Sequence, residues 1–142
     1  WDMHADSNNP SVAVGMPRMA PPVDRALSAF VEDLRERGML DDVLIVVTGD
    51  FGRTPKINKN ISRDHWPKCY TALLAGGGTQ GGAVFGESDR YGAVPDRDPV
   101  TTGDLAATMY HALGIDPATE IRDNFNRPLP IANGRPVTEI FV

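Results

Sequence analysis

Apolar residues recur at helical spacing across residues 23–34, and charged residues take the opposite side. The apolar set is Val23, Ala26, Leu27, Phe30, Val31 and Leu34. Pro22 suits the first turn of a helix, and Gly38 suits the position just past its end. The pattern therefore predicts an amphipathic helix between Pro22 and Gly38. Residues 2–22 are predicted to form a loop, because Asn, Pro and Gly interrupt every period there.

An uninterrupted apolar run at residues 43–47 follows the predicted helix. A short β-branched run of this kind is typical of a strand buried on both faces, as in a parallel sheet. Residues 70–75 form a second such candidate, and residues 83–85 a shorter strand. The first strand ends in the polar turn at residues 48–53. Helix, strand and turn together predict half of an α/β unit, with a site at the carboxyl end of the strand.

One more helix is predicted near residue 102. Three apolar residues share its stripe: Leu105, Met109 and Leu113. Either Thr101 or Thr102 could cap its start, and Gly114 suits its end. Residues 87–99 are predicted to be a polar loop, and residues 137–142 an edge strand.

Charge and cysteine content narrow the classes of function. A net charge of −5 argues against nucleic acid as the main partner, because phosphate backbones are bound by basic surfaces. The single cysteine, Cys69, rules out a framework of disulfides within the chain. No apolar run approaches the length of a membrane span. Because the chain opens at Trp1 in a loop-like tract, we expect an N-terminal half, with any export signal, to precede it.

Asp2 and His4 are the first candidates for metal ligands. Alternate residues of extended backbone face the same side, so both side chains can reach one ion. A carboxylate with an imidazole suits Zn²⁺ or another divalent metal, although the same triplet is common by chance. Asp50 follows the first predicted strand, where it could serve as a ligand or catalytic group or satisfy its own turn.

Asp64 and His65 form a second candidate pair. One of them would bind a metal while the other orients it, or both would belong to an ordinary polar loop. Four cations lie around this region in the sequence: Arg53, Lys56, Lys59 and Lys68. They indicate a local anion site, in which the planar fork of Arg53 fits phosphate or sulfate oxygens best. Trp1 and Trp66 flank the two histidine motifs, where they could wall a pocket or simply pack.

Three segments together resemble a known family: WDMH, VVTGDFGRTPKINKN and RDHWPKCYTALLAGGG. With the helix patterns VDRALSAFVEDLRERGMLDD and DLAATMYHALGI, nearly the whole chain resembles the bacterial domain of unknown function 1501 family. GDFGRTP and RDHWP are the most specific parts of the resemblance. Members of that family are abundant in planctomycetes and often labelled sulfatase-like, and the family is similar to the alkaline phosphatase superfamily.

The resemblance implies an α/β fold with a mostly parallel sheet flanked by helices. Residues 1–142 would be the C-terminal portion of a single alkaline-phosphatase-like or sulfatase-like domain. The implied cofactor is a divalent metal, zinc first, with calcium or manganese as alternatives. Its ligands would be Asp2, Asp50 and His65, with His4 as a fourth.

The implied function is metal-dependent hydrolysis of sulfate or phosphate esters, with Arg53 stabilising charge on the transferring group. Further residues would support the site or contact substrate: Asp64, Lys56 and Trp66. The substrate would be a small anionic ester or a sulfated polysaccharide, in a periplasmic or extracellular setting. The missing N-terminal half would supply the nucleophile, so we expect the chain alone to be inactive.

Phe51 stands where the superfamily has a histidine after the aspartate, and the spacing from Asp2 to His4 is shorter than the superfamily's. These departures keep two alternatives open. One is a degenerate domain that binds metal or anionic polysaccharide without turnover. The other is a structural domain whose Asp and His side chains satisfy loops.

Overall fold

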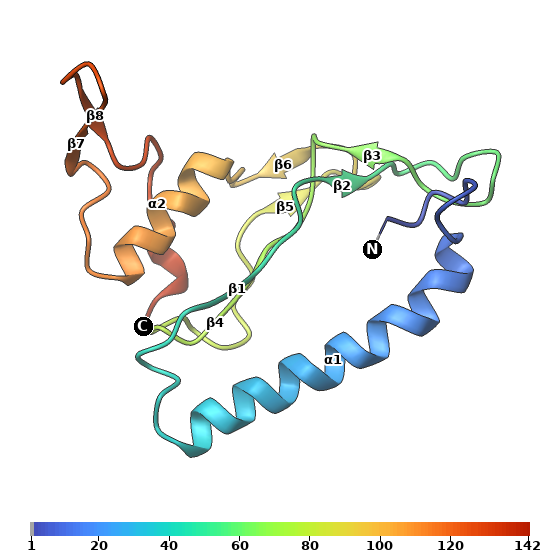
Figure 1. Cartoon of the computed structure of the whole chain (residues 1–142), viewed down its shortest axis with the longest axis horizontal. Helices are drawn as coiled ribbons and strands as arrows, with labels where there is room; N and C mark the ends of the chain where they lie inside the picture. Colours follow the sequence, from blue (N-terminus) through green and yellow to red (C-terminus); the bar gives the residue numbers. More distant parts are fainter. Residues whose placement is uncertain (1) are drawn as a thin grey trace.

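The computed structural model describes residues 2–142. These residues form two α-helices, eight short strands and one 3₁₀ turn (Figure 1). In chain order they are α1 (Val12–Glu36), β1 (Ile45–Val47), β2 (Gly52–Arg53), β3 (His65–Trp66), β4 (Leu73–Ala75), β5 (Glu87–Ser88), β6 (Pro95–Arg97), α2 (Thr102–Ala112), β7 (Glu120–Arg122), β8 (Pro128–Pro130) and η1 (Thr138–Ile140).

Helix α1 is longer than its sequence pattern predicts. It begins at Val12, so the loop predicted for residues 2–22 is wrong beyond its first half. Pro17, Pro21 and Pro22 all lie inside the helix. Proline has a fixed φ that suits a helix but lacks an N–H, so each one removes a backbone hydrogen bond without forcing the helix to end. The predicted end is confirmed, because α1 ends at Glu36, Arg37 is its C-cap, and Gly38 follows with a φ of +67°.

The expected mostly parallel sheet flanked by helices is wrong. Every strand pair among residues 2–142 is antiparallel, and the strands form four separate two-stranded sheets. In β1 and β4, Ile45 faces Ala75 and Val47 faces Leu73. Val47 and Leu73 are 40% and 45% exposed, so neither strand is buried on both faces. An apolar run predicts a strand, but it carries no information on the direction of the partner strand or on what covers its faces.

Several shorter elements also differ from their predictions. The predicted loop at residues 87–99 contains the pair β5 and β6, whereas residues 83–85 form no strand. The predicted edge strand at residues 137–142 is the turn η1 with one bridge between Thr79 and Phe141. Helix α2 is confirmed, with Thr101 as its cap and Gly114 just beyond its end at a φ of +72°.

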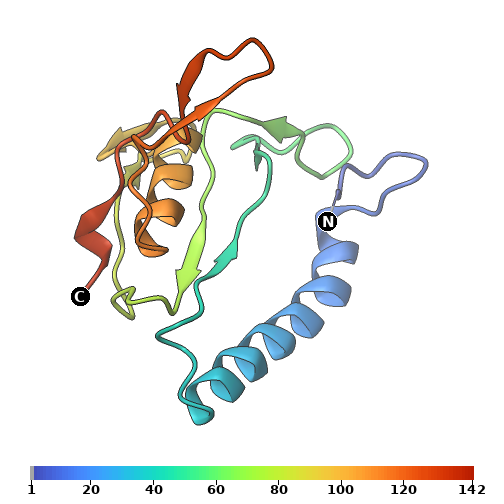
Figure 2. The ribbon, with the colours of Figure 1, turned by 60° about the vertical axis from the view of Figure 1, so that its left-hand side comes forward.

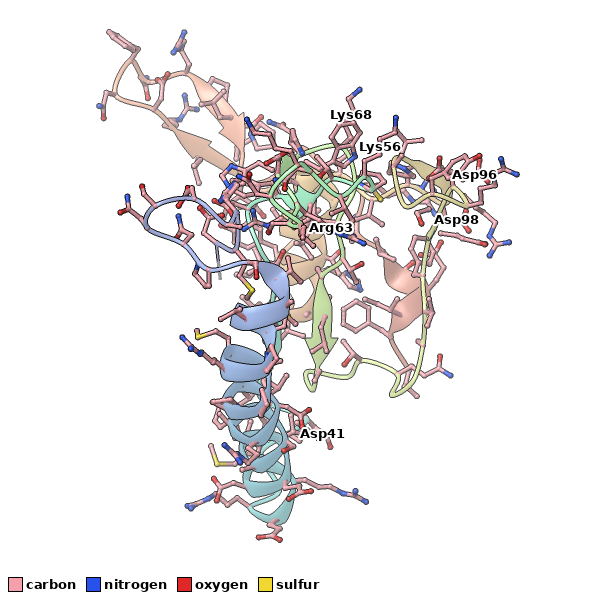
Figure 3. All side chains as sticks on the ribbon, turned by 90° about the vertical axis from the view of Figure 1, so that its right-hand side faces the viewer. Asp41, Lys56, Arg63, Lys68, Asp96 and Asp98 are labelled. Atoms are coloured by element: carbon pink, nitrogen blue, oxygen red, sulfur yellow. The ribbon has the colours of Figure 1, made fainter. Side chains whose placement is uncertain are left out.

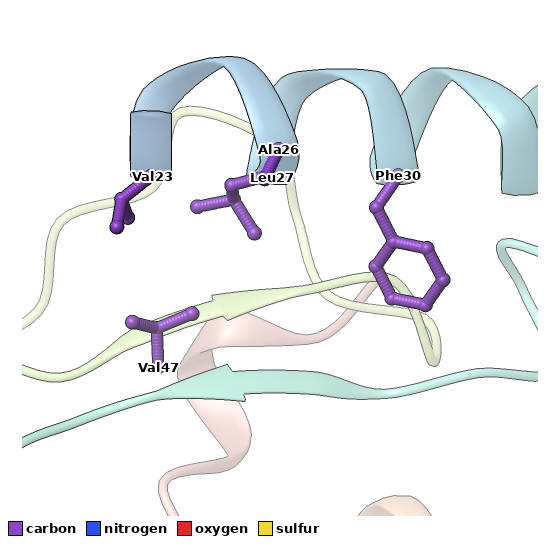
Figure 4. A pocket seen from close by; sticks show the side chains of 5 residues that line it. All are labelled: Val23, Ala26, Leu27, Phe30 and Val47. Atoms are coloured by element: carbon purple, nitrogen blue, oxygen red, sulfur yellow. The ribbon is translucent and has the colours of Figure 1, made fainter. Parts of the chain in front are cut away.

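The core is sparse and dispersed. Only three hydrophobic residues in the described chain are buried: Met3, Leu34 and Ala107. Figures 1 and 2 show α1 along one side of the molecule, with β1 and β4 beside it and α2 beyond them. An open apolar groove of about 370 Å³ separates α1 from β1, lined by Val23, Ala26, Leu27, Phe30 and Val47 (Figure 4). Neither helix in residues 2–142 has the length and apolarity needed to cross a membrane.

Candidate metal centre

The N-terminal segment is fixed at Met3. The Met3 side chain is 5% exposed and packs against Gly15 of α1, where an added Cβ would lie 2.7 Å from the Met3 Cγ atom. The fully buried hydroxyl of Ser62 donates a hydrogen bond to the carbonyl oxygen of Met3. Since Met3 takes one side of the segment, its neighbours Asp2 and His4 are directed to the other side.

Strands β2 and β3 place a second pair of side chains beside this segment. Arg53 lies opposite His65, and Gly52 lies opposite Trp66. Directly opposed residues of an antiparallel pair share a face, so the guanidinium and the imidazole extend in the same direction. Gly52 leaves no room for a side chain, because a Cβ there would collide with the carbonyl oxygen of Cys69. The close approach of the Gly52 and Cys69 backbones thus fixes the position of the neighbouring residue Arg53.

Asp2, His4 and His65 converge on one point although Asp2 and His65 are 63 positions apart in the sequence. The Oδ1 atom of Asp2 lies 2.9 Å from Nε2 of His65 and 3.1 Å from Nδ1 of His4. One potential ligand atom from each of the three residues falls within 4.8 Å of the others. The two imidazole rings are tilted by 55° with their centroids 4.4 Å apart.

Arg53 also contacts the carboxylate of Asp2. Its Nη2 atom lies 2.5 Å from Asp2 Oδ1, and its Nη1 atom lies 3.4 Å from Nε2 of His4. The hydrogen bond from His65 and then that from Arg53 lower the pKa of Asp2 from 3.8 to about 2. The carboxylate is therefore ionised at neutral pH, which a metal ligand of this type requires.

The three side chains fit a divalent cation. Zinc bonds of about 2.0–2.2 Å place neighbouring ligand atoms of a tetrahedral site about 3.3 Å apart. The distances from Asp2 Oδ1 to the two imidazole nitrogens, 2.9 Å and 3.1 Å, are close to this value. His4 Nδ1 is the one buried side-chain nitrogen or oxygen in the described chain that makes no hydrogen bond, because its approach to Asp2 lacks hydrogen-bond geometry. Two imidazoles and a carboxylate form a set used for Zn²⁺ and for Fe²⁺.

Phe51 is part of this centre, a role that the sequence did not predict. Its ring stacks on the imidazole of His65, with centroids 3.9 Å apart and planes 29° apart. The guanidinium carbon of Arg53 lies 5.9 Å from the centroid of the same ring. The side chain that follows Asp50 in the sequence therefore packs against both a candidate ligand and the neighbouring cation. An aromatic residue between Asp50 and Arg53 was the only signal for it.

Asp50 is exposed and lies outside the cluster of Asp2, His4 and His65. Its role as a ligand stays a prediction. The Asp64 carboxylate accepts a hydrogen bond of 2.9 Å from the Asn58 amide, which orders the loop between β2 and β3.

The remaining predicted residues lie around the centre. Trp66 donates from its indole nitrogen to the Ala93 carbonyl oxygen at 2.6 Å, and the ammonium of Lys68 lies 5.2 Å from the centroid of its ring. Figure 3 shows Lys56, Lys68 and Arg63 at one end of the molecule, where Asp96 and Asp98 also lie, and Asp41 well away from them. Trp1 lies outside the described residues.

Comparison with known proteins identifies one family. The family described as "Protein of unknown function (DUF1501)" matches residues 1–141. No curated protein and no solved structure matches the chain.

Proposed function

The chain belongs to the DUF1501 family of proteins of unknown function, and we propose that its Asp2, His4 and His65 side chains hold a divalent cation that serves hydrolysis of phosphate or sulfate esters. The observation that carries this proposal is the convergence of three ligand atoms within 4.8 Å beside an arginine. Zinc is the first candidate, because two imidazoles and a carboxylate complete three of its four positions and leave one for water or substrate.

The cation bound here would polarise an ester oxygen and lower the pKa of a water molecule. The protein's own contribution is orientation and charge. His65 is held by the Phe51 ring, and Asp2 by Met3 and Ser62, which anchor its backbone. Outer contacts of this kind orient metal ligands and strengthen metal binding.

Arg53 supports an anionic substrate. Its guanidinium lies at the carboxylate of Asp2 and presents planar donors that match two oxygens of a phosphate or sulfate group. Lys56 and Lys68 add positive charge at one end of the molecule, where Asp96 and Asp98 also lie (Figure 3), and the net charge of the chain is −5. An anionic ester drawn to this end would meet the metal ligands and Arg53 together.

Metal analysis and an ester assay test the proposal together. The full natural protein, rather than residues 1–142 alone, would be loaded with Zn²⁺, Mn²⁺ or Fe²⁺ and assayed with aryl phosphates and aryl sulfates. His65→Ala would remove a ligand, and His111→Ala is the matched control, because His111 packs against Phe141 at an interplanar angle of 67° and belongs to α2. We expect hydrolysis of one ester class that is lost in His65→Ala and kept in His111→Ala.

Two results would contradict this function in different ways. If the protein bound metal through Asp2 and His65 but hydrolysed neither ester class, the hydrolase function would be wrong. The remaining interpretation would be a domain that binds metal or anionic polysaccharide without turnover. If the protein bound no metal, the proposed metal centre itself would be wrong.

A further inference from the structure

Resting on the proposed metal site, we propose that the metal and Arg53 exchange places on Asp2 and His4. Before the cation binds, the guanidinium holds both residues. When the cation binds, Arg53 is displaced from them and becomes a ligand for a tetrahedral oxyanion beside it. Metal binding would thereby create the anion site, and the two ligands would bind cooperatively.

The first support is that one oxygen atom is shared. Asp2 Oδ1 lies 2.5 Å from Arg53 Nη2, 2.9 Å from His65 Nε2 and 3.1 Å from His4 Nδ1. A divalent cation bound by all three residues would occupy the space around this oxygen. Two cations on one carboxylate oxygen repel each other, which favours the departure of the guanidinium from Asp2.

The second support is the contact between Arg53 and His4. A guanidinium only donates hydrogen bonds, so the 3.4 Å contact from Arg53 Nη1 requires Nε2 of His4 to be the acceptor and places the ring proton on Nδ1. A metal that binds Nδ1, the nitrogen facing Asp2, needs the lone pair of that atom. The proton then lies on Nε2 and points at the donors of Arg53. Metal binding therefore also removes the contact between Arg53 and His4.

Arg53 remains near the centre after this exchange. Its backbone is held in β2 opposite His65, and its Nη1 atom also approaches the Arg63 carbonyl oxygen at 3.5 Å. The Phe51 ring offers a cation–π contact 5.9 Å from the guanidinium carbon. A guanidinium directed away from Asp2 but tethered here fits phosphate or sulfate oxygens bidentately. Each ligand would then favour the other, as linkage requires.

Zinc affinity, measured with a fluorescent zinc indicator, tests the exchange. The probes are zinc alone, zinc with methyl phosphate and zinc with methyl sulfate. In the wild-type protein we expect one of the two anions to tighten zinc binding by about 5- to 150-fold, the usual range of coupling between sites. In Arg53→Gln, zinc alone should bind about fivefold more tightly, because the competing ion pair is gone, and neither anion should tighten it further.

Two variants keep this test decisive. Arg63→Gln removes an exposed cation near the same centre and should behave as the wild type. Arg53→Lys keeps the charge but not the planar fork, so its coupling to the anion should fall even if Arg53→Gln does not fold.

Equal zinc affinity of the wild type and Arg53→Gln would overturn the exchange while leaving the metal site in place. Zinc affinity of the wild type that neither anion changes would overturn it as well. Failure of both proteins to bind zinc would overturn the metal site and the exchange together. Zinc binding by Arg53→Gln alone would support the exchange, with Arg53 as the dominant competitor.

Discussion

The phenyl ring of Phe51 lies stacked on the imidazole of His65, with 3.9 Å between their centroids. The His65 side chain is 44% exposed, and its ring also lies 4.4 Å from the His4 ring, measured between centroids. The stack leaves Nε2 directed at Asp2, at 2.9 Å. Phe51 thus orients a candidate ligand without being one.

Replacing Phe51 by leucine should weaken zinc binding by about tenfold, the lower end of the effect of residues that orient metal ligands. Phe51→Tyr keeps the ring and should bind zinc as the wild type does. The measurement is a zinc titration, supplemented by the Co²⁺ absorption spectrum, which reports ligand geometry. If the leucine variant keeps both affinity and spectrum, Phe51 only fills space.

The two helices show which features the sequence could predict and which it could not. Helix α2 follows from a stripe at helical spacing, a capping threonine and a terminal glycine, all of which are local signals. The start of α1 was missed because Pro17, Pro21 and Pro22 usually mark a boundary. Whether a proline ends a helix depends on the turns around it, and its presence in the sequence does not reveal them.

The strands and the site show a second limit. The apolar run of β1 predicted a strand, but its antiparallel partner β4 is a tertiary contact that no local pattern encodes. Asp2, His4 and His65 were proposed as ligands, and the structure brings them together. Asp50 was proposed on an expected sheet edge that the structure does not form, and it lies outside the cluster.

Removing individual carboxylates and imidazoles should therefore have unequal effects. His65→Ala should weaken zinc binding by at least about 100-fold, because a direct ligand contributes more than the residues that orient it. Asp50→Ala should bind zinc close to the wild-type affinity, because its carboxylate is not among the clustered ligand atoms. Isothermal titration with zinc would compare the two variants. A large loss in Asp50→Ala would instead identify Asp50 as a fourth ligand.

Ser62 links the loop between β2 and β3 to the N-terminal segment. Its fully buried hydroxyl donates to the Met3 carbonyl, so Ser62→Ala leaves that acceptor unpaired. We expect a loss of about 1–3 kcal/mol in the free energy of unfolding and weaker zinc binding through Asp2 and His4. Denaturant unfolding and zinc titration measure the two effects. The matched control is Ser28→Ala on the exposed side of α1, which should change stability by no more than about 0.5 kcal/mol.

Thr101 caps α2 through a reciprocal pair of hydrogen bonds. The Asp104 N–H donates to the Thr101 hydroxyl at 3.1 Å, and the Thr101 N–H donates to the Asp104 carboxylate at 2.8 Å. Thr101→Ala should lower the free energy of unfolding by about 1 kcal/mol and leave zinc affinity unchanged, because α2 does not contribute to the metal centre. Thr102→Ala, one position inside the helix, should have a smaller effect. Equal losses in the two variants would argue against the cap.

Acid should weaken the contacts of Asp2 in a defined range of pH. Hydrogen bonds, first from His65 and then from Arg53, lower its pKa from 3.8 to about 2 in the folded protein. The folded state therefore holds the ionised carboxylate more strongly than the unfolded chain does. The resulting stability is fully present above about pH 3.8 and is lost as the pH falls through about 2.

Asp2→Asn isolates this contribution. Other carboxyl groups with lowered pKa values lose stability in acid as well: Asp6, Asp104 and Asp123. The informative quantity is therefore the difference in melting temperature between the metal-free wild type and Asp2→Asn, measured from neutral pH down to about pH 2. We expect the wild type to melt higher at neutral pH, with the difference narrowing only below about pH 4. A difference that stays constant over this range would mean that the ionised Asp2 carboxylate contributes nothing to folding through His65 and Arg53.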